Sequence, residues 1–317
     1  MSDANQSQSN TSSLQQYQGI LERALFSTLN TLPCCVFLFI NGSMMFTLRS
    51  KDLFCQTSRY VLLFNLLVTD TLQMALSQLL YIIAACRIFL TYPVCGTLTL
   101  LTSLTTVISP LTLVLMALER YAAVCFPLRH ASIISIRNTA LAILMVWAFS
   151  SLDIFTQVIL LSFDDLPTLQ MKDFCSYAAM LVGYTSEIYN TVFTCSLFVS
   201  AGVAVISAYI GVIVAARSAS ADKALARKAR NTLLLHLVQL GLSLSSTIYI
   251  PLLKALSRIL TRIVFVRLQS VLYVCIFIFP RCLSSLIYGI RDQSIRPVLV
   301  YHLCCHLKLP VVPVRQV

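Results

Sequence analysis

Charge is what this chain of 317 residues lacks most. Charged residues make up 11% of it, against about 25% in an ordinary soluble domain, while hydrophobic residues make up 58%. Acidic residues are scarcer than basic ones: there are 12 aspartates and glutamates and 23 lysines and arginines, so the formal net charge is +11. This composition excludes an ordinary soluble protein and indicates a polytopic membrane protein.

A cleavable signal peptide is also missing, because the first twenty residues are polar and contain no apolar core region. The first apolar stretch is then expected to act as its own insertion signal. Residues 1–22 are rich in Ser, Asn and Gln, which predicts a disordered extracellular tail. Asn5 and Asn10 begin the sequons Asn-Gln-Ser and Asn-Thr-Ser, so we predict that both are glycosylated.

Long apolar runs are abundant. Seven stretches have about 20 or more residues with no charge or one isolated charge, enough to cross a bilayer as a helix. They lie near 24–48, 60–86, 94–118, 138–161, 188–214, 231–253 and 268–290. The predicted fold is an all-α membrane protein, a seven-transmembrane helix bundle over 23–290, followed by a cytoplasmic segment over 291–317.

The basic residues predict the orientation, since short loops rich in Lys and Arg stay in the cytoplasm. With the N terminus outside, 15 of the 23 lysines and arginines fall in inner segments and seven in outer ones. The positive charge therefore indicates attraction to anionic inner-leaflet lipid and to an intracellular partner, and not nucleic-acid binding.

Enzyme chemistry finds no support in the sequence. The four histidines, His130, His236, His302 and His306, all fall on the predicted inner side, and none belongs to a motif that pairs it with a nucleophilic Ser or Cys. We predict no enzymatic activity, no cofactor and no metal site.

Three charges interrupt the apolar stretches: Asp70, Asp153 and Arg281. Asp70 is about 11 residues from Arg59, or roughly 16 Å into the bilayer at 1.5 Å per residue. Charges at such depth are costly and usually functional. One interpretation is a channel or transporter in which they line a path, but the inverted repeats or matched broken helices typical of transporters are not visible.

Hydroxyl side chains mark the third stretch, with a spacing that places most of them on one helix face. They are Thr99, Thr102, Ser103, Thr106 and Ser109. With Asp153 and Thr247, the first four form our predicted ligand pocket. The alternative is that they only join helices by hydrogen bonding.

The third stretch ends in Glu119-Arg120-Tyr121, and the simplest explanation of this pair is two flanking charges that reach for water. The surrounding residues are more specific. They resemble the odorant-receptor form of a motif of rhodopsin-like G-protein-coupled receptors, M-A-x-[DE]-R-Y-x-A-[IV]-C-x-P-L-x-[YH]. The matches are Met116, Ala117, Glu119, Arg120, Tyr121, Ala123, Val124, Cys125, Pro127, Leu128 and His130.

A second motif lies at the start of the sixth stretch. Lys228, Ala229, Thr232, His236 and Leu237 match the odorant-receptor pattern K-A-x-x-T-C-x-S-H-L, which Leu233 and Leu235 break. Tyr209 and Tyr288 fall where the family has tyrosines, whereas Ser284 and Ser285 replace the family's Asn-Pro before Tyr288. Fish odorant receptors resemble the chain most.

The resemblance implies a receptor of the plasma membrane that binds a small-molecule odorant and activates a heterotrimeric G protein of the stimulatory or olfactory type. In that family Arg120 is held by Glu119 at rest and turns toward Tyr209 and Tyr288 on activation, next to His236. The resemblance also implies a disulfide between Cys95 and Cys175, against the alternative of two free thiols.

Arg281 is not expected from the family, whose aspartate at the position of Asp70 commonly holds a sodium ion with a serine, here Ser109. Arg281 lies at nearly the depth of Asp70, and a guanidinium matches a carboxylate in a bidentate fork. We predict a buried pair that replaces the ion, against the alternative of an arginine turned toward lipid.

The segment after the seventh stretch predicts a short amphipathic helix on the inner leaflet. Ile295, Val298, Leu299 and Leu303 fall on one face of it. Cys304 and Cys305 at its end are candidates for palmitoylation, with unmodified cysteines as the equal alternative.

Overall fold

The computed structural model describes residues 2–86, 88–127, 129, 134–163, 175, 184–218, 261–281 and 295–303, and isolated positions between 227 and 260. Side chains are described from Leu25 onward. Within these ranges the regular elements are helices and no strand occurs. They are α1 (Ser2–Arg49), α2 (Asp52–Cys55), α3 (Ser58–Ala85), α4 (Tyr92–Cys125), α6 (Ile136–Phe163), α8 (Tyr184–Ser218), α10 (Arg262–Leu272), the π-helix η1 (Tyr273–Ile278) and α12 (Arg296–Leu303).

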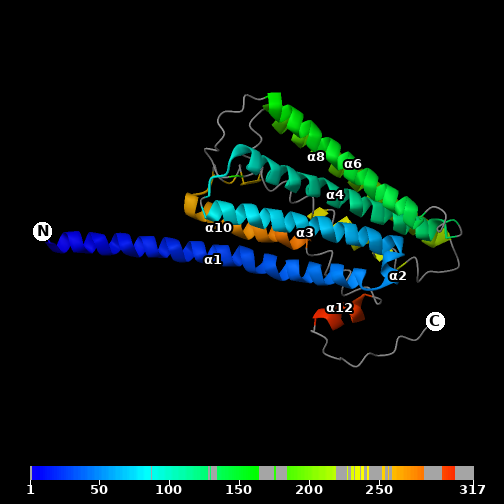
Figure 1. Cartoon of the computed structure of the whole chain (residues 1–317), viewed down its shortest axis with the longest axis horizontal. Helices are drawn as coiled ribbons and strands as arrows, with labels where there is room; N and C mark the ends of the chain where they lie inside the picture. Colours follow the sequence, from blue (N-terminus) through cyan, green and yellow to red (C-terminus); the bar gives the residue numbers. More distant parts are fainter. Residues whose placement is uncertain are drawn as a thin grey trace.

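The long helices form one bundle of elements that run roughly along a common direction (Figure 1). Helices α1, α3, α4, α6 and α8 each contain a segment long and apolar enough to cross a membrane. These five confirm the first five spans predicted from the sequence. The outward faces of α1, α6 and α8 expose many large apolar side chains, among them Phe39, Leu144 and Val199, as helices in contact with lipid require.

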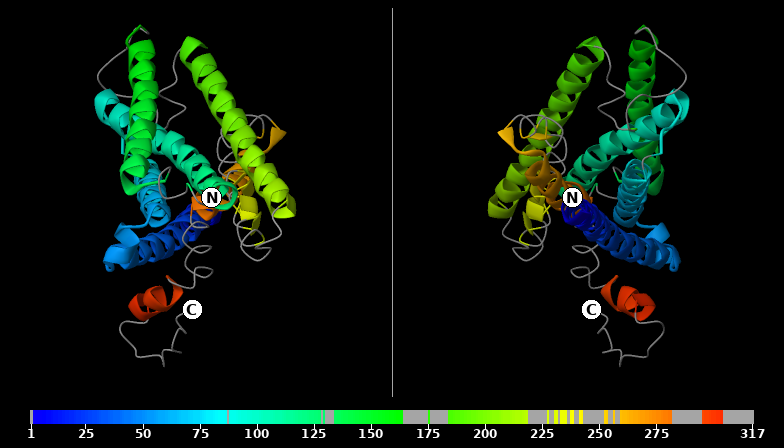
Figure 2. Two further views of the ribbon diagram at one scale, coloured as in Figure 1. Left: turned by 90° about the vertical axis from the view of Figure 1, so that its right-hand side faces the viewer. Right: turned by 90° about the vertical axis from the view of Figure 1, so that its left-hand side faces the viewer.

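Helix α4 is the centre of the bundle, because it contacts α3, α6 and α8. Both views of Figure 2 show it crossing obliquely between these neighbours. It extends to Cys125, seven residues beyond the predicted end at 118, so Glu119, Arg120 and Tyr121 lie in its last turns. Charged side chains at the end of a membrane helix can reach the polar interface without ending the helix. The first charges after the apolar run therefore do not mark the end of α4, and the predicted end at 118 was too early.

Helix α1 begins at Ser2, so the polar residues 2–22 continue the helix, where we expected a disordered tail. Figure 1 shows these first turns projecting beyond the ends of the other helices. Disorder was expected because most helical stability in proteins comes from packing of an apolar face, and residues 2–22 contain no apolar run. That residues 1–22 form an extracellular tail remains a prediction.

The seventh predicted span starts earlier than expected, at Arg262 instead of 268, and it is helical from there to Arg281. Its second part is the wide π-helical turn η1. Pro280 follows within two residues, and a proline ring clashes with the carbonyl of the residue four positions earlier, here Ile276 inside η1. The widened turn relieves that clash. The rest of the predicted span, residues 282–290, lies outside the described part of the chain.

Most of the sixth predicted span, 231–253, also lies outside the described residues. Two of its described side chains, Leu233 and Leu237, pack into an apolar cluster built by α4 and α8 around Ala117, Phe198 and Val205. The described residues Leu233 and Leu237 of the sixth span therefore lie against the centre of the bundle.

Helix α12 packs against α1 near α2, at the end of the bundle where α1 stops (Figure 1). Ile295 and Leu299 are buried in a cluster with Met44 and Leu48 of α1, whereas Arg296 is exposed. The described part of this segment therefore has the amphipathic character that the sequence predicts.

Helices α4 and α8 approach each other closely at Gly211. A Cβ atom added there would collide with the ring of Tyr121, and the Cys125 thiol donates a hydrogen bond to the Gly211 carbonyl at 3.8 Å. The absence of a side chain at this position is therefore what permits the contact.

We expect Gly211→Ala to destabilise the protein by about 1–3 kcal/mol, because the added methyl overpacks the α4–α8 contact. Thermal unfolding of the purified protein in detergent measures the effect. Gly202→Ala on the same helix is the matched control, since a Cβ there meets nothing within 4 Å and alanine favours a helix by up to about 1 kcal/mol. Equal unfolding temperatures for the two variants would contradict this account.

Candidate functional site

The centre of the bundle holds a buried ion pair. The Arg281 guanidinium, just after η1, lies with its Nη1 3.2 Å from Asp70 Oδ1 on α3. Both side chains are only 2% exposed. The Ser109 hydroxyl of α4 donates a hydrogen bond to the same carboxylate oxygen at 2.8 Å. The three residues that the sequence placed at similar depth thus meet at one point and join three helices.

Further polar contacts extend from this pair along α3. Gln73, one turn from Asp70, donates from Nε2 to Thr106 of α4 at 2.7 Å. On the other side, Asn65 donates to Thr112 of α4 at 2.9 Å and accepts from the Trp147 indole of α6 at 3.0 Å. The membrane-embedded interface of α3 and α4 is therefore held by hydrogen bonds as well as by apolar packing.

A further hydrogen bond ties α1 to the same helix. The Asn41 amide of α1 donates to the Thr71 hydroxyl of α3 at 3.2 Å.

Asp153 of α6 forms a second buried polar cluster. Its carboxylate accepts from the Tyr189 hydroxyl of α8 at 3.0 Å and from the Gln157 amide at 2.9 Å. Gln157 also donates to Ser103 of α4 at 3.4 Å. Asp153 is 3% exposed, and both of these donors are neutral. The cluster joins α4, α6 and α8 in the half of the bundle that contains Cys95.

The hydroxyls of α4 do not act as one set. Thr99, Thr102 and Thr106 donate to carbonyls one turn earlier on their own helix, at 2.9 Å each. Ser103 accepts from α6, whereas Thr106 and Ser109 bond to residues of α3. The expected single face is thus divided between two neighbouring helices, and contact with a ligand remains a prediction.

Cys95 at the start of α4 is bonded to Cys175 through a disulfide with an S–S distance of 1.98 Å. This confirms the predicted pairing. The bond is buried, and it attaches the connection between α6 and α8 to the end of the central helix.

At the opposite end of α4, Arg120 Nε lies 3.2 Å from Glu119 Oε2, and the two side chains are partly exposed at 19% and 9%. Tyr121 and Tyr209 both pack on the apolar cluster between α4 and α8 that contains Leu233. The predicted switch residues Tyr121 and Tyr209 therefore lie beside Leu233 of the sixth span, and Glu119 and Arg120 directly precede Tyr121 on α4.

Other predicted site residues lie outside the described part of the chain: His236, Tyr288, Thr247, Cys304 and Cys305. Asn5 and Asn10 belong to the first turns of α1, but their side chains are not described.

Sequence reasoning missed Gln73, Gln157 and Tyr189. The two glutamines had a usable signal, because each is a polar residue in an apolar helix, three or four positions after a buried aspartate. Tyr189 had none, since a tyrosine near a helix end is ordinary, and only the packing of α8 on α6 brings it to Asp153.

We expect Asp70→Asn or Arg281→Leu alone to destabilise the protein by about 3–5 kcal/mol, because each leaves a stranded buried charge or an unmatched partner. The double variant should recover part of the loss. Surface expression and thermal unfolding measure this. Ser109→Ala is the control and should cost less, about 1.5–3 kcal/mol, because it removes one hydrogen bond to a charged group and leaves the ion pair in place. Single variants that express and unfold like the unaltered protein would contradict the importance of the pair.

Comparison with known proteins agrees with this architecture. The model of the seven-transmembrane receptor family of the rhodopsin type matches residues 41–304. Odorant receptor 131-2 of Danio rerio is 35% identical over 274 residues, which cover 85% of this chain and 83% of that protein. The range matched by the family model contains the positions of Asp70, Arg281 and the Glu119–Arg120 pair, and it extends beyond the described spans. The chain therefore belongs to the rhodopsin family of seven-transmembrane receptors.

Proposed function

We propose that this chain is an odorant receptor that binds a small molecule from outside the cell and activates a heterotrimeric G protein inside it. The observation that carries the proposal is the similarity to a zebrafish protein named as an odorant receptor over most of both chains. It agrees with the two sequence motifs around Arg120 and Leu237, which belong to the odorant branch of the family.

The proposed orientation has the N terminus outside the plasma membrane and the C terminus inside. Disulfides form on the oxidising side, and the Cys95–Cys175 bond lies at the start of α4. The Glu119–Arg120 pair lies at the opposite end of α4, and most basic residues of the sequence fall in segments predicted to be on that side. These two observations support the same orientation.

The ligand is proposed to bind in the outer half of the bundle, near Thr99, Thr102 and Ser103 on α4, with Asp153, Thr106 and Thr247 as further candidates. The Asp153 cluster favours this half, because a buried carboxylate bonded to neutral donors is a polar feature that a ligand can recognise. An agonist must bind the active arrangement more tightly, since equal affinity for both states shifts nothing.

Arg120 is the proposed inner switch. At rest the Glu119 carboxylate neutralises it at 3.2 Å. Activation separates the pair and turns Arg120 toward Tyr209 and Tyr288, as the sixth span moves away from α4 and α8. His236 lies at the start of that span and belongs to the same proposed surface for a G protein of the stimulatory or olfactory type.

The site around Asp70 does not fit the sodium ion that receptors of this family commonly hold there. Arg281 already brings a positive charge to 3.2 Å from the carboxylate, and Ser109 donates to the same oxygen. A cation placed beside them would meet an arginine of like charge. The proposed activation therefore involves no sodium ion at this site.

Agonist affinity should accordingly be unchanged when sodium chloride is replaced by a chloride salt of a large organic cation at equal ionic strength. Radioligand or fluorescence competition with any agonist identified for the receptor measures this. A clear sodium-dependent shift in affinity would contradict the assignment of Arg281 as the resident counter-charge.

A panel of small odorants tested on cells that express the chain, with cAMP as the readout, tests the receptor function itself. At least one compound should raise cAMP, and Arg120→Ala should abolish the response while surface expression is retained. Arg137→Ala, an exposed arginine in the first turn of α6, is the matched control and should signal normally. Ion flux through the purified protein in lipid without a G protein would contradict the proposal.

A further inference from the structure

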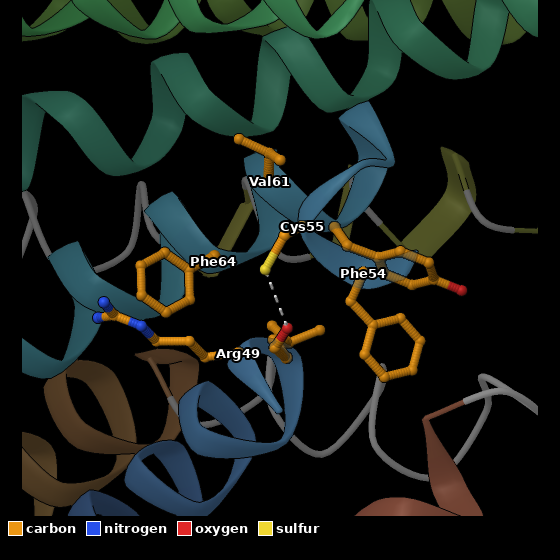
Figure 3. Close-up of a pocket in the computed structure, with 7 residues that line it drawn as sticks. Arg49, Phe54, Cys55, Val61 and Phe64 are labelled. Carbon is orange, nitrogen blue, oxygen red and sulfur yellow. Dashed lines mark hydrogen bonds between the residues drawn. The ribbon is translucent and has the colours of Figure 1, made fainter. Parts of the chain in front are cut away.

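A small apolar pocket opens at the end of the bundle where α1 meets α2 and α3. Its volume is about 190 Å³, and Figure 3 shows the side chains around it. The lining residues are Leu48, Arg49, Phe54, Cys55, Tyr60, Val61 and Phe64. None of them belongs to the site described above.

The wall of the pocket is well packed. Leu48 and Phe54 are buried in the same cluster as Met44 and Leu63, and the Phe54 ring meets Tyr60 edge to face at 4.9 Å. The Cys55 thiol donates to the Leu48 carbonyl at 3.8 Å, the contact drawn as a dashed line in Figure 3. Buried and hydrogen-bonded neighbours therefore support the lining on the sides of α1 and α2.

Basic residues lie on the lining of the pocket and next to it in the chain. Arg49 belongs to the lining and is exposed. Lys51, two residues further along, is also exposed, and Arg59 lies over the ring of the lining residue Tyr60 at 5.6 Å. Between positions 49 and 59 only Asp52 is acidic. A molecule that fits this pocket therefore needs an apolar part to fill the cavity and an anionic group to pair with the basic residues.

Position and size restrict the occupant further. The pocket lies where α1 ends and α3 begins, at a boundary of the membrane-spanning segments. Its volume is below the roughly 300–1,000 Å³ of sites for drug-sized ligands but above the approximately 150 Å³ apolar cavity that binds benzene. It therefore admits a short length of hydrocarbon chain and not a whole small-molecule ligand.

We propose that this pocket binds one acyl chain of an anionic phospholipid, whose headgroup pairs with Arg49 and Lys51. The choice of the cytoplasmic leaflet rests on the orientation given under Proposed function, whereas the binding chemistry does not. Leu48 and Phe54 join the occupied pocket to the apolar cluster that also buries Ile295 and Leu299 beside α12, so a lipid there contacts the inner end of the bundle directly.

The test uses the full-length protein in phosphatidylcholine nanodiscs that contain a trace of phosphatidylserine with a photoreactive acyl chain. After irradiation, mass spectrometry locates the labelled residues. We expect labelling within 48–64, about fivefold stronger than with the matched phosphatidylcholine probe, since a basic residue near the surface favours anionic lipid by about that factor.

The variants separate the two parts of the site. Arg49→Gln with Lys51→Gln should reduce the phosphatidylserine signal to the phosphatidylcholine level, and Cys55→Phe should reduce both signals by filling the cavity. Arg137→Gln, an exposed arginine of α6 outside the pocket, should change neither.

Equal labelling by the two probes, labelling outside 48–64, or no effect of the double variant would overturn the proposal. If Cys55→Phe fails to fold, the double variant still decides. No agonist or G protein is needed, so failure here is distinct from failure of the receptor function.

Discussion

The contact between Asp70 and Arg281 is the constraint on which the rest of the bundle depends. A charge inside a bilayer is costly unless it is paired, and here both side chains are only 2% exposed. The pair is possible only if α3 and the helix that follows η1 present these two residues to each other. Ser109 adds α4 to the same point. One interaction therefore fixes the rotation of three helices about their axes.

Helix α4 connects the functional regions on either side of this pair. At one end it carries the disulfide and, through Ser103, the Asp153 cluster. At the other end it carries the Glu119–Arg120 pair and the close contact of Tyr121 with Gly211. In the proposed receptor function, this single helix contacts both the proposed ligand region and the proposed intracellular switch.

Some features follow from rules that act along the chain. Charge scarcity and apolar runs predicted the fold class, and the first five spans are confirmed. Counting residues from Arg59 and from the end of the seventh stretch put Asp70 and Arg281 at similar depth, and their side chains meet in the structure. The hydrogen bond from Tyr189 to Asp153 could not be predicted from the sequence, because only the packing of α8 on α6 brings the two residues together.

The sequence by itself determined the fold class, the first five apolar spans, the pairing of Asp70 with Arg281, and the family. Hydrophobicity, residue spacing and motifs are local properties, and a bilayer requires an apolar run for each span. Tertiary structure alone decided how the α4 hydroxyls divide between α3 and α6, that a π-helical turn precedes Pro280, and that α1, α2 and α3 enclose a pocket. These features depend on the rotation and spacing of packed helices, which no periodicity along one segment encodes.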